Sequence, residues 1–344
     1  MRVLLIKSRS KGGISSHIQH IITGMRAYNI EFQEHEVTTA PIKIIKNFAM
    51  LRDNIKKFSP DIVHIHGYKA LLFIVFIPRH VKIVVTFHGF LDNLPRLKRK
   101  IFQFLLSKVV NKADRIICVS KKLTDQSSES LKIKKDKVTT IHNGVKISES
   151  EGLHESGIKT SGNGNVILGA CGRLTEAKGF DILIKAFNKI KDAFPVELHI
   201  IGDGPAFKKL KDSAQDKIYF LGFQDNPLET MCRFDYFVQP SRTEGCGTAV
   251  IEAMSINLPV IISDAGGLPE LIEDNVHGLV FKKGDVDDLT RCLTMLLSNR
   301  ELYKHLGAEN KKWVSKNFSI SKMLMKTLNL YEEMMGEEVY EEIL

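Results

Sequence analysis

A chain of 344 residues with a hydrophobic fraction of 43% is long enough for two globular domains, each with its own core. No run approaches the roughly 18 consecutive apolar residues of a membrane-spanning helix, and the first residues lead into a strand pattern without a signal-peptide cleavage site. The five cysteines are dispersed and form no CxxC pair, which indicates reduced thiols in a cytoplasmic chain and disfavours a cysteine metal site.

The net charge of +9 is unevenly distributed along the chain. Residues 1–152 contain 27 Lys and Arg against 12 Asp and Glu, whereas residues 153–344 contain 22 against 28. This imbalance predicts that the basic half faces a polyanion: an anionic membrane surface, a phosphorylated acceptor or nucleic acid. A solvated lysine-rich surface is the alternative interpretation.

In residues 1–150, short β-branched runs alternate with segments of helical periodicity. Strands are predicted over residues 2–7, 61–67, 82–89, 114–120 and 138–144. The first strand meets Gly12 and Gly13, and a helix with apolar residues such as Ile14, Ile18 and Ile21 follows. Because the strands are apolar throughout, we expect a parallel sheet covered on both faces.

Residues 151–165 are polar, without apolar periodicity, and we interpret them as an interdomain linker. A second series of strands and helices then occupies residues 166–318. Its strands are predicted over residues 166–171, 196–201, 218–221, 236–239, 260–263 and 278–281. We expect the last segment, 319–344, to be helical and to pack back on the first domain. The predicted fold class is therefore α/β, with two Rossmann-like, doubly wound domains facing across a cleft that binds the ligand.

The segment from Pro240 to Met254 is rich in groups suited to binding. Glu244 and Glu252 stand eight residues apart, separated by a glycine-rich turn that includes Gly247 and by a helix expected to begin near Thr248. Glycines allow close backbone approach, and the amides at a helix start favour an anion. Glu252, inside that helix, could accept paired hydrogen bonds from ribose hydroxyls. A capping carboxylate and a solvated helical glutamate are the plainer alternative.

Arg173 and Lys178 follow the first strand of the second series, across a polar turn. Two cations there could neutralise a diphosphate, whose charge grows as a glycosidic bond breaks, and we therefore expect neither a metal ion nor another cofactor. Two unrelated surface cations are the alternative interpretation.

These segments, in this order, resemble the retaining GT-B glycosyltransferases of family 4. Gly172–Gly179 resembles the family's phosphate-binding segment, Gly202–Pro205 its donor-domain turn, and Glu244 to Glu252 its E-x7-E motif. Cys246 stands where the family usually has Phe after Glu-Gly, and Ile256–Leu258 lacks the common Gly. We expect both departures to change the shape of the pocket.

The resemblance implies roles for further residues. Gly13 belongs to a glycine loop whose amides face the donor phosphates and the acceptor. His88 contacts the transferred sugar, as does Glu244, and orients it instead of acting as an obligatory base. Taken alone, His64 and His66 are interpreted as packing residues.

The stretch from Arg96 to Val110 is a predicted basic helix with a large apolar component. Its cations Arg96, Lys98, Arg99 and Lys100 could contact anionic headgroups while apolar side chains insert between the lipids. The alternative is an ordinary helix that covers the sheet and exposes its cations.

Three other functions compete with sugar transfer. A dinucleotide-dependent oxidoreductase is disfavoured because no G-x-G-x-x-G follows any predicted strand. A GT-B-like epimerase or phosphorylase is disfavoured by the Arg–Lys pair together with E-x7-E, and by the chain length. A nucleic-acid-binding protein fits the basic charge, but no recognised binding module accompanies it.

The expected substrates are a nucleotide sugar, with a UDP-sugar favoured over GDP-mannose, and a saccharide or lipid-linked saccharide acceptor. By likeness to bacterial surface-polysaccharide enzymes, we expect a hexosyltransferase in cell-surface polysaccharide or lipopolysaccharide synthesis. It would act in the cytoplasm, in peripheral contact with the inner membrane.

Overall fold

The protein is described by a computed structural model over residues 1–8, 13–38, 41–91, 95–147, 164–300 and 306–337. The chain divides into two compact units. Unit 1 comprises Met1–Gly144 together with Ile320–Leu344, and unit 2 comprises Val145–Ser319. Apart from residues 164 and 165, the predicted linker lies outside the described residues.

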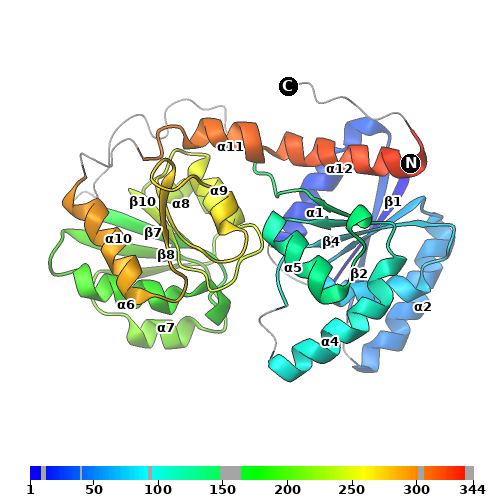
Figure 1. Cartoon of the computed structure of the whole chain (residues 1–344), viewed down its shortest axis with the longest axis horizontal. Coiled ribbons are helices and arrows are strands. Elements are labelled where there is room, and N and C mark those ends of the chain that lie inside the picture. The colour runs from blue at the N-terminus through cyan, green and yellow to red at the C-terminus, as the bar shows by residue number, and fades with distance from the viewer. Residues whose placement is uncertain (9–12, 39–40, 92–94, 148–163, 301–305, 338–344) are drawn as a thin grey trace. The chain divides into compact units, whose positions relative to one another are not determined.

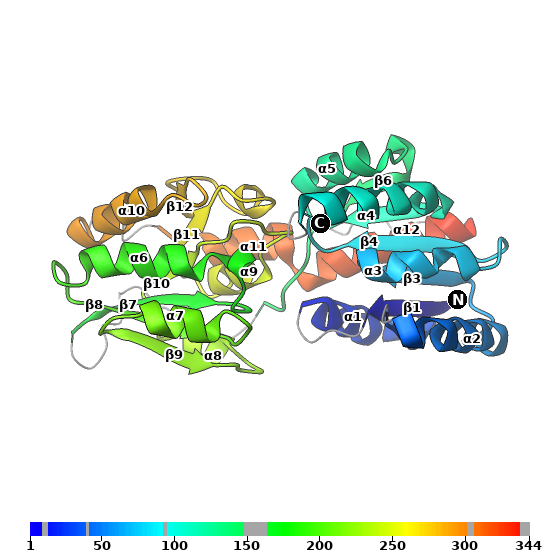
Figure 2. The same ribbon diagram turned by 90° about the horizontal axis from the view of Figure 1, so that it is seen from below.

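Unit 1 is built on a six-stranded parallel sheet of order β2-β1-β3-β4-β5-β6 (Figures 1 and 2). The strands are β1 (Arg2–Ser8), β2 (Glu31–Val37), β3 (Ile62–His66), β4 (Lys82–Phe87), β5 (Arg115–Cys118) and β6 (Val138–Thr140). The strand order reverses between β1 and β3, so the segments that follow these two strands diverge at the point where doubly wound sheets bind ligands.

The edge strand β2 was missed by the sequence analysis. Its sequence carries a glutamate at Glu31, Glu34 and Glu36, which does not match the apolar pattern of a buried strand. Of the described strands it pairs with β1 alone, in a register from Arg2↔Glu31 to Ser8↔Val37. An edge strand is solvated along one side, so charged side chains are tolerated there.

The helices of unit 1 cover both faces of its sheet. They are α1 (Gly13–Gly24), α2 (Pro41–Phe58), α3 (Tyr68–Leu71), α4 (Arg96–Val109), α5 (Lys121–Leu131) and α12 (Ile320–Met335), with short 3-10 turns that include η2 (Leu72–Phe76). Helices α1 and α12 contact each other, and Ile18 and Tyr331 share a core with Val3 and Leu5 of β1. The end of the chain therefore completes the core formed by its beginning (Figure 1).

Unit 2 repeats the architecture with the strand order β12-β11-β10-β7-β8-β9. The strands are β7 (Val166–Cys171), β8 (Val196–Ile201), β9 (Ile218–Gly222), β10 (Tyr236–Gln239), β11 (Val260–Ser263) and β12 (Gly278–Phe281). This is the usual dinucleotide-fold order, with its reversal between β7 and β10. The predicted fold class of two Rossmann-like sheets is confirmed.

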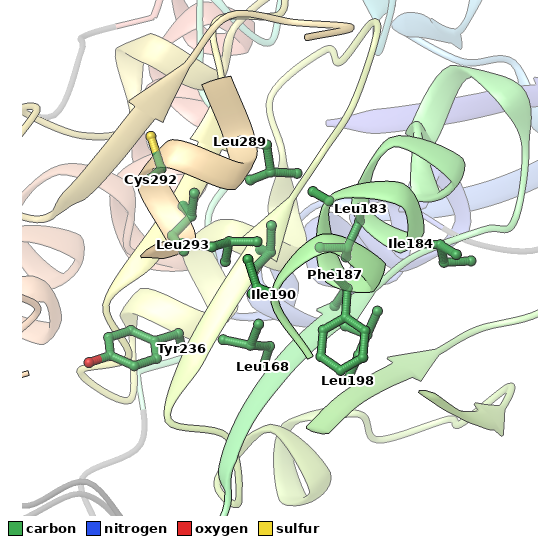
Figure 3. Packing of buried hydrophobic residues seen from close by; sticks show 14 of the residues in the cluster. Leu168, Leu183, Ile184, Phe187, Ile190, Leu198, Tyr236, Leu289, Cys292 and Leu293 are labelled. Atoms are coloured by element: carbon green, nitrogen blue, oxygen red, sulfur yellow. The ribbon is translucent and has the colours of Figure 1, made fainter. Parts of the chain in front are cut away.

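Unit 2 contains the helices α6 (Phe180–Ile190), α7 (Phe207–Ser213), α8 (Leu228–Met231), α9 (Thr248–Met254), α10 (Val286–Ser298) and α11 (Asn310–Phe318), with the 3-10 turns η5 (Glu176–Lys178) and η6 (Leu268–Glu270). Helices α6 and α10 pack together through Phe187 and Leu293 against Leu168 and Leu198 of the sheet (Figure 3). Full burial of one such side chain contributes roughly 1.5–3 kcal/mol.

Aspartates anchor the amino ends of three strands. Asp61 Oδ2 accepts a hydrogen bond from Arg2 N at 2.7 Å, Asp114 Oδ2 from Ile83 N at 2.8 Å, and Asp235 Oδ2 from Ile167 N at 2.7 Å. Burial raises the pKa of Asp235 to about 7. Because these carboxyl groups lie at the end of each sheet opposite to the ligand-binding end, we assign them to the fold and not to chemistry.

Candidate active site

In unit 2, the predicted donor residues follow the two strands at which the strand order reverses. Arg173 and Lys178 come after β7, whereas Glu244, Gly247 and Thr248 come after β10, which pairs directly with β7. The carboxyl ends of neighbouring parallel strands lie at the same edge of the sheet, so both segments converge there.

Lys178 and Glu244 form an ion pair, with Lys178 Nζ 2.5 Å from Glu244 Oε2. Ser241 Oγ donates to the same carboxylate oxygen at 3.0 Å, and Gln239 Nε2 donates to Ser241 Oγ at 2.8 Å. The Glu244 side chain is only 12% exposed. The Lys178 cation and the Glu244 carboxylate are thus held in contact at the carboxyl ends of β7 and β10.

Glycine and arginine bring the two segments together. At Gly179 the backbone has φ of +66°, and a Cβ there would lie 2.0 Å from the carbonyl oxygen of Pro240. Arg242 spans the same gap by donating to both carboxylate oxygens of Asp181, at 2.6 and 2.8 Å, and to Glu176 O at 3.0 Å. The Arg242 guanidinium holds the pKa of Asp181 below its usual value. Lys178 is therefore fixed beside Glu244 by the backbone and not only by its own charge.

Arg173 is exposed and, among the residues that the structure describes, makes no hydrogen bond or ion pair. It follows Gly172, whose carbonyl oxygen would lie 2.0 Å from a Cβ added at Gly202 of the next strand end. Glycine at position 202 therefore lets the segments after β7 and β8 approach closely beneath Arg173. The guanidinium remains available for a ligand anion.

Glu252 lies within α9 and is half-buried. Burial raises its pKa to about 7, and the Glu252 charge in turn helps to raise the pKa of the Cys171 thiol at the end of β7. Across the described parts of the chain its carboxyl group has no hydrogen-bond partner. A desolvated acceptor of this kind gains most from a ligand that brings hydroxyl donors.

The turn between these glutamates is closely packed. Gly247 has φ of +77°, and a Cβ there would lie 2.5 Å from Leu268 Cδ2. Helix α9 begins at Thr248, as predicted, and Cys246 is buried. The position at which family 4 usually has a phenylalanine thus holds a small, buried side chain in this chain.

The chain contains one Asp-x-Asp triplet, Asp285–Asp287, which does not form a metal site. Asp285 Oδ1 accepts hydrogen bonds from the amides of Asp287 and Asp288 and so caps α10. Asp287 pairs with Lys189. Both carboxylates are occupied in stabilising unit 2.

In unit 1, His88 belongs to a group of three histidines. Side chains alternate between the faces of a strand, so His64 and His66 of β3 lie on the same face as Thr86 and His88 in and after β4. His66 Nδ1 lies 3.1 Å from His88 Nε2, and the ring of His17, from α1, lies 4.8 Å from that of His88.

Burial keeps these imidazoles neutral. It lowers the pKa of His17 to about 4, and burial together with the neighbouring imidazoles holds the pKa values of His66 and His88 well below the usual range. His88 is the partly exposed member of the group. At neutral pH it can donate or accept a hydrogen bond but carries no charge.

His64 has a different role, and the interpretation of it as a packing residue agrees with its contacts. Its Nδ1 lies 2.5 Å from Tyr331 Oη of α12, and its Nε2 lies 2.7 Å from Thr86 Oγ1. Both ring nitrogens are therefore used inside the core.

The sequence analysis did not single out His17, Ser241 or Arg242, and it assigned His66 to packing only. The repeat of histidine at positions 64, 66 and 88, each at or near a strand end, was the one visible signal for the histidine group. Arg242 gave none, because its partners Glu176 and Asp181 precede it by 66 and 61 residues. Ser241 gave none either, although its contact with Glu244 spans only three residues.

Other predicted residues are placed as follows. Gly13 begins α1, and an added Cβ would meet no described atom within 4 Å; Gly12 lies outside the described residues. The predicted basic helix is confirmed as α4, in which Lys98 and Lys100 are exposed and Arg99 is half-buried. The side chain of Arg96 lies outside the described residues. Among the described helices, none is long and apolar enough to cross a bilayer.

Comparisons with known proteins match both halves of the chain. Residues 30–149 match the model named Glycosyltransferase Family 4, and residues 155–313 match that of glycosyl transferases group 1. The chain is a glycosyltransferase of the family 4 type with a GT-B fold. The resemblance to family 4 and the expected GT-B fold are therefore confirmed.

Individual relatives match this chain over most of its length. An uncharacterized glycosyltransferase of Methanocaldococcus jannaschii is 29% identical over 94% of this chain and 95% of its own. The O-antigen biosynthesis glycosyltransferase WclY of Escherichia coli is 26% identical over 85% of this chain and 84% of its own. The crystal structure of Anabaena HepE in complex with UDP and glucose superposes with a TM-score of 0.78 at 18% identity, over 97% of this chain and 100% of that one, which supports the fold.

Proposed function

We propose that this glycosyltransferase is a retaining hexosyltransferase that uses a UDP-sugar and needs no metal ion. The observation that carries the proposal is the Lys178–Glu244 pair at the β7/β10 reversal. It is flanked by the exposed Arg173 and by Glu252, whose carboxyl group has no hydrogen-bond partner among the described residues. A nucleotide sugar presents ribose hydroxyls, a diphosphate and sugar hydroxyls in that order, and these side chains match each part.

In this proposal, Arg173 and Lys178 bind the diphosphate, and Gly247 and Thr248 lie beside it. Glu252 accepts hydrogen bonds from the ribose hydroxyls. Because Lys178 touches Glu244 directly, the cation that meets the β-phosphate lies next to the carboxylate that binds the sugar hydroxyls. This adjacency fits the junction between phosphate and sugar, where the bond is broken.

The reaction breaks the bond between the anomeric carbon and the β-phosphate oxygen and forms one from that carbon to the acceptor oxygen on the same face. The acceptor hydroxyl passes its proton to the departing phosphate, so the products are UDP and the glycoside. Arg173 and Lys178 stabilise the charge that develops on the phosphate. In this proposal neutral His88 orients the sugar by a hydrogen bond, and the resemblance to family 4 assigns the Gly13 amide to the donor phosphates and the acceptor.

The direct test is UDP release from a panel of UDP- and GDP-sugars, with purified protein and EDTA present. We expect turnover with at least one UDP-hexose, unchanged by EDTA, and retention of the anomeric configuration by NMR once an acceptor is supplied. Turnover only with added divalent metal, an inverted product or a strict preference for GDP-mannose would each refute the corresponding part.

We further propose that the acceptor is a saccharide or lipid-linked saccharide of cell-surface polysaccharide synthesis, reached at an anionic membrane on its cytoplasmic side. The support is helix α4, which exposes Leu97, Ile101, Phe104 and Leu105, with Leu97 72% and Phe104 61% exposed. These positions recur at helical spacing and form one apolar stripe, with the exposed cations Lys98 and Lys100 on the same helix.

The contacting turn η2 enlarges this surface, since Val75 and Phe76 are also exposed. Apolar and cationic groups together fit an anionic lipid surface better than a nucleic acid, which would not require the apolar stripe. Each cation near such a surface contributes about 1 kcal/mol.

Vesicle co-sedimentation tests the membrane contact. Replacing Lys98, Arg99 and Lys100 by Glu should lower partition onto anionic vesicles at least about 100-fold at low salt. The matched control replaces Lys208, Lys209 and Lys211 of α7 by Glu and should partition like the wild type. If both variants sediment equally, or if the wild type does not sediment at all, then the cations of α4 are ordinary solvent-exposed side chains and the membrane contact is refuted. Retention of RNA or DNA on filters by the wild type alone would instead favour nucleic acid.

A further inference from the structure

The group formed by His17, His66 and His88 has a geometry that sugar binding by His88 does not require. One ring nitrogen from each lies within 4.8 Å of the other two. Three separate elements supply them: α1 provides His17, the end of β3 provides His66, and the residue after β4 provides His88. They gather beside the β1/β3 reversal, the ligand-binding point of unit 1.

The hydrogen bonding of the group is incomplete. His17 Nδ1 and His66 Nε2 are buried and have no hydrogen-bond partner among the residues that the structure describes. Buried polar nitrogens of this kind cost roughly 1–3 kcal/mol each unless a partner is present. Nearby His64 cannot satisfy them, since Tyr331 and Thr86 already occupy its two nitrogens.

We propose that His17, His66 and His88 bind a divalent transition-metal ion of the zinc type. A tetrahedral ion with bonds of about 2.0–2.1 Å holds two ligand nitrogens about 3.4 Å apart. The distance of 3.1 Å from His66 Nδ1 to His88 Nε2 is already close to this spacing, and His17 offers a ring nitrogen within 4.8 Å of the other two. Because His66 would bind through Nδ1, the unpartnered nitrogen that argues for the ion is that of His17 and not His66 Nε2.

The electrostatics favour such a ligand set. Imidazole nitrogens select zinc, cobalt, nickel or copper over magnesium and calcium, which prefer oxygen. The nearby cation Lys7 is paired with Glu34 at 2.7 Å, which reduces its repulsion of a bound ion.

The ion would inhibit the enzyme instead of supporting the chemistry. Coordination through the Nε2 that His88 turns toward His66 would fix the orientation of the ring and place a positive charge beside the residue that is proposed to orient the sugar. This consequence rests on the proposed function, whereas the binding itself does not.

Metal binding is measured first, without an activity assay. Protein treated with EDTA and then desalted is titrated with Co²⁺, followed by tetrahedral absorption bands, and with Zn²⁺ by calorimetry. We expect one ion per chain with micromolar affinity. The variants His17→Asn, His66→Gln and His88→Asn should each weaken binding at least about tenfold. His80→Gln, at an exposed position outside the group, should bind like the wild type.

Circular dichroism and melting curves check that each variant folds, and the partly exposed His88→Asn variant serves if the buried changes do not. Absence of a tetrahedral cobalt spectrum in the wild type, or equal affinity in all variants, would overturn the metal site. Zinc should also slow UDP release in the wild type in proportion to occupancy. If the ion binds but no donor is turned over, the proposed function fails and the site stands. If turnover occurs and zinc neither binds nor inhibits, the metal site fails and the proposed function stands.

Discussion

Substitution of Lys178 by Ala tests the donor site most directly. In the structure, Lys178 is a quarter exposed and contacts a nearly buried Glu244, so its charge acts in a partly desolvated setting. Removal of a preorganised group that stabilises a leaving diphosphate costs roughly 2–4 kcal/mol of transition-state stabilisation, a fall of about 30- to 1,000-fold in kcat/KM.

The same change has a structural effect that must be separated from catalysis. Without Lys178, the Ser241 hydroxyl is the one partner that the Glu244 carboxylate keeps among the described residues, so the carboxylate is left as a poorly paired, nearly buried charge. We expect a loss of folding stability of about 1–3 kcal/mol. Adding Glu244→Gln should restore much of this stability, because the orphaned charge is removed, but it should not restore turnover.

The assay is UDP release, combined with urea unfolding of each variant. Lys189→Ala is the matched control, because Lys189 also pairs with a carboxylate in unit 2 but at an exposed surface, and such pairs contribute about 0–1 kcal/mol. It should leave turnover unchanged. Wild-type kcat/KM in the Lys178→Ala variant would refute the assignment of Lys178 to the phosphate, and a full rescue by Glu244→Gln would reduce the pair to a structural contact.

Three further predictions concern the two glutamates of the donor site and the contact between Tyr331 and His64. Glu252→Ala should weaken UDP binding, since the ribose loses its acceptor, whereas Glu244→Ala should mainly lower turnover; equal losses of UDP affinity by calorimetry would contradict this division. Burial raises the pKa of Glu252 to about 7, so its contribution to folding stability is complete below about pH 4.5 and is lost as the pH rises through 7. Over that window the melting temperature of the wild type should fall relative to that of Glu252→Gln, whereas the affinity of the wild type for UDP should rise. A pH-independent difference between the two proteins would argue against a titrating Glu252. Tyr331→Phe removes the hydroxyl that forms a hydrogen bond with His64 and should lower the free energy of unfolding by about 1–3 kcal/mol. UDP affinity should change much less. An unchanged denaturation midpoint would show that this contact between α12 and β3 contributes nothing to stability.

The limits of sequence reasoning are visible at single residues. Runs of apolar and β-branched residues located eleven of the strands, most of which are buried on both faces. Strand β2 was missed because three glutamates interrupt its apolar pattern, which its edge position tolerates, whereas the edge strands β6, β9 and β12 carry no more than one polar residue type that breaks the pattern. The pairing of His66 with His88 could not be read from the chain, since it depends on the register of β3 and β4.

Local periodicity and short segments were enough to predict the two Rossmann-like sheets, the family 4 motifs and the residue types at the donor site. Which of these residues meet depends on the tertiary structure. The strand order of unit 2 places the segments after β7 and β10 together, and Gly179 and Arg242 hold Lys178 against Glu244. In unit 1, the strand register and α1 gather three neutral histidines. Such meetings depend on long-range packing between strands, and a one-dimensional pattern does not specify it.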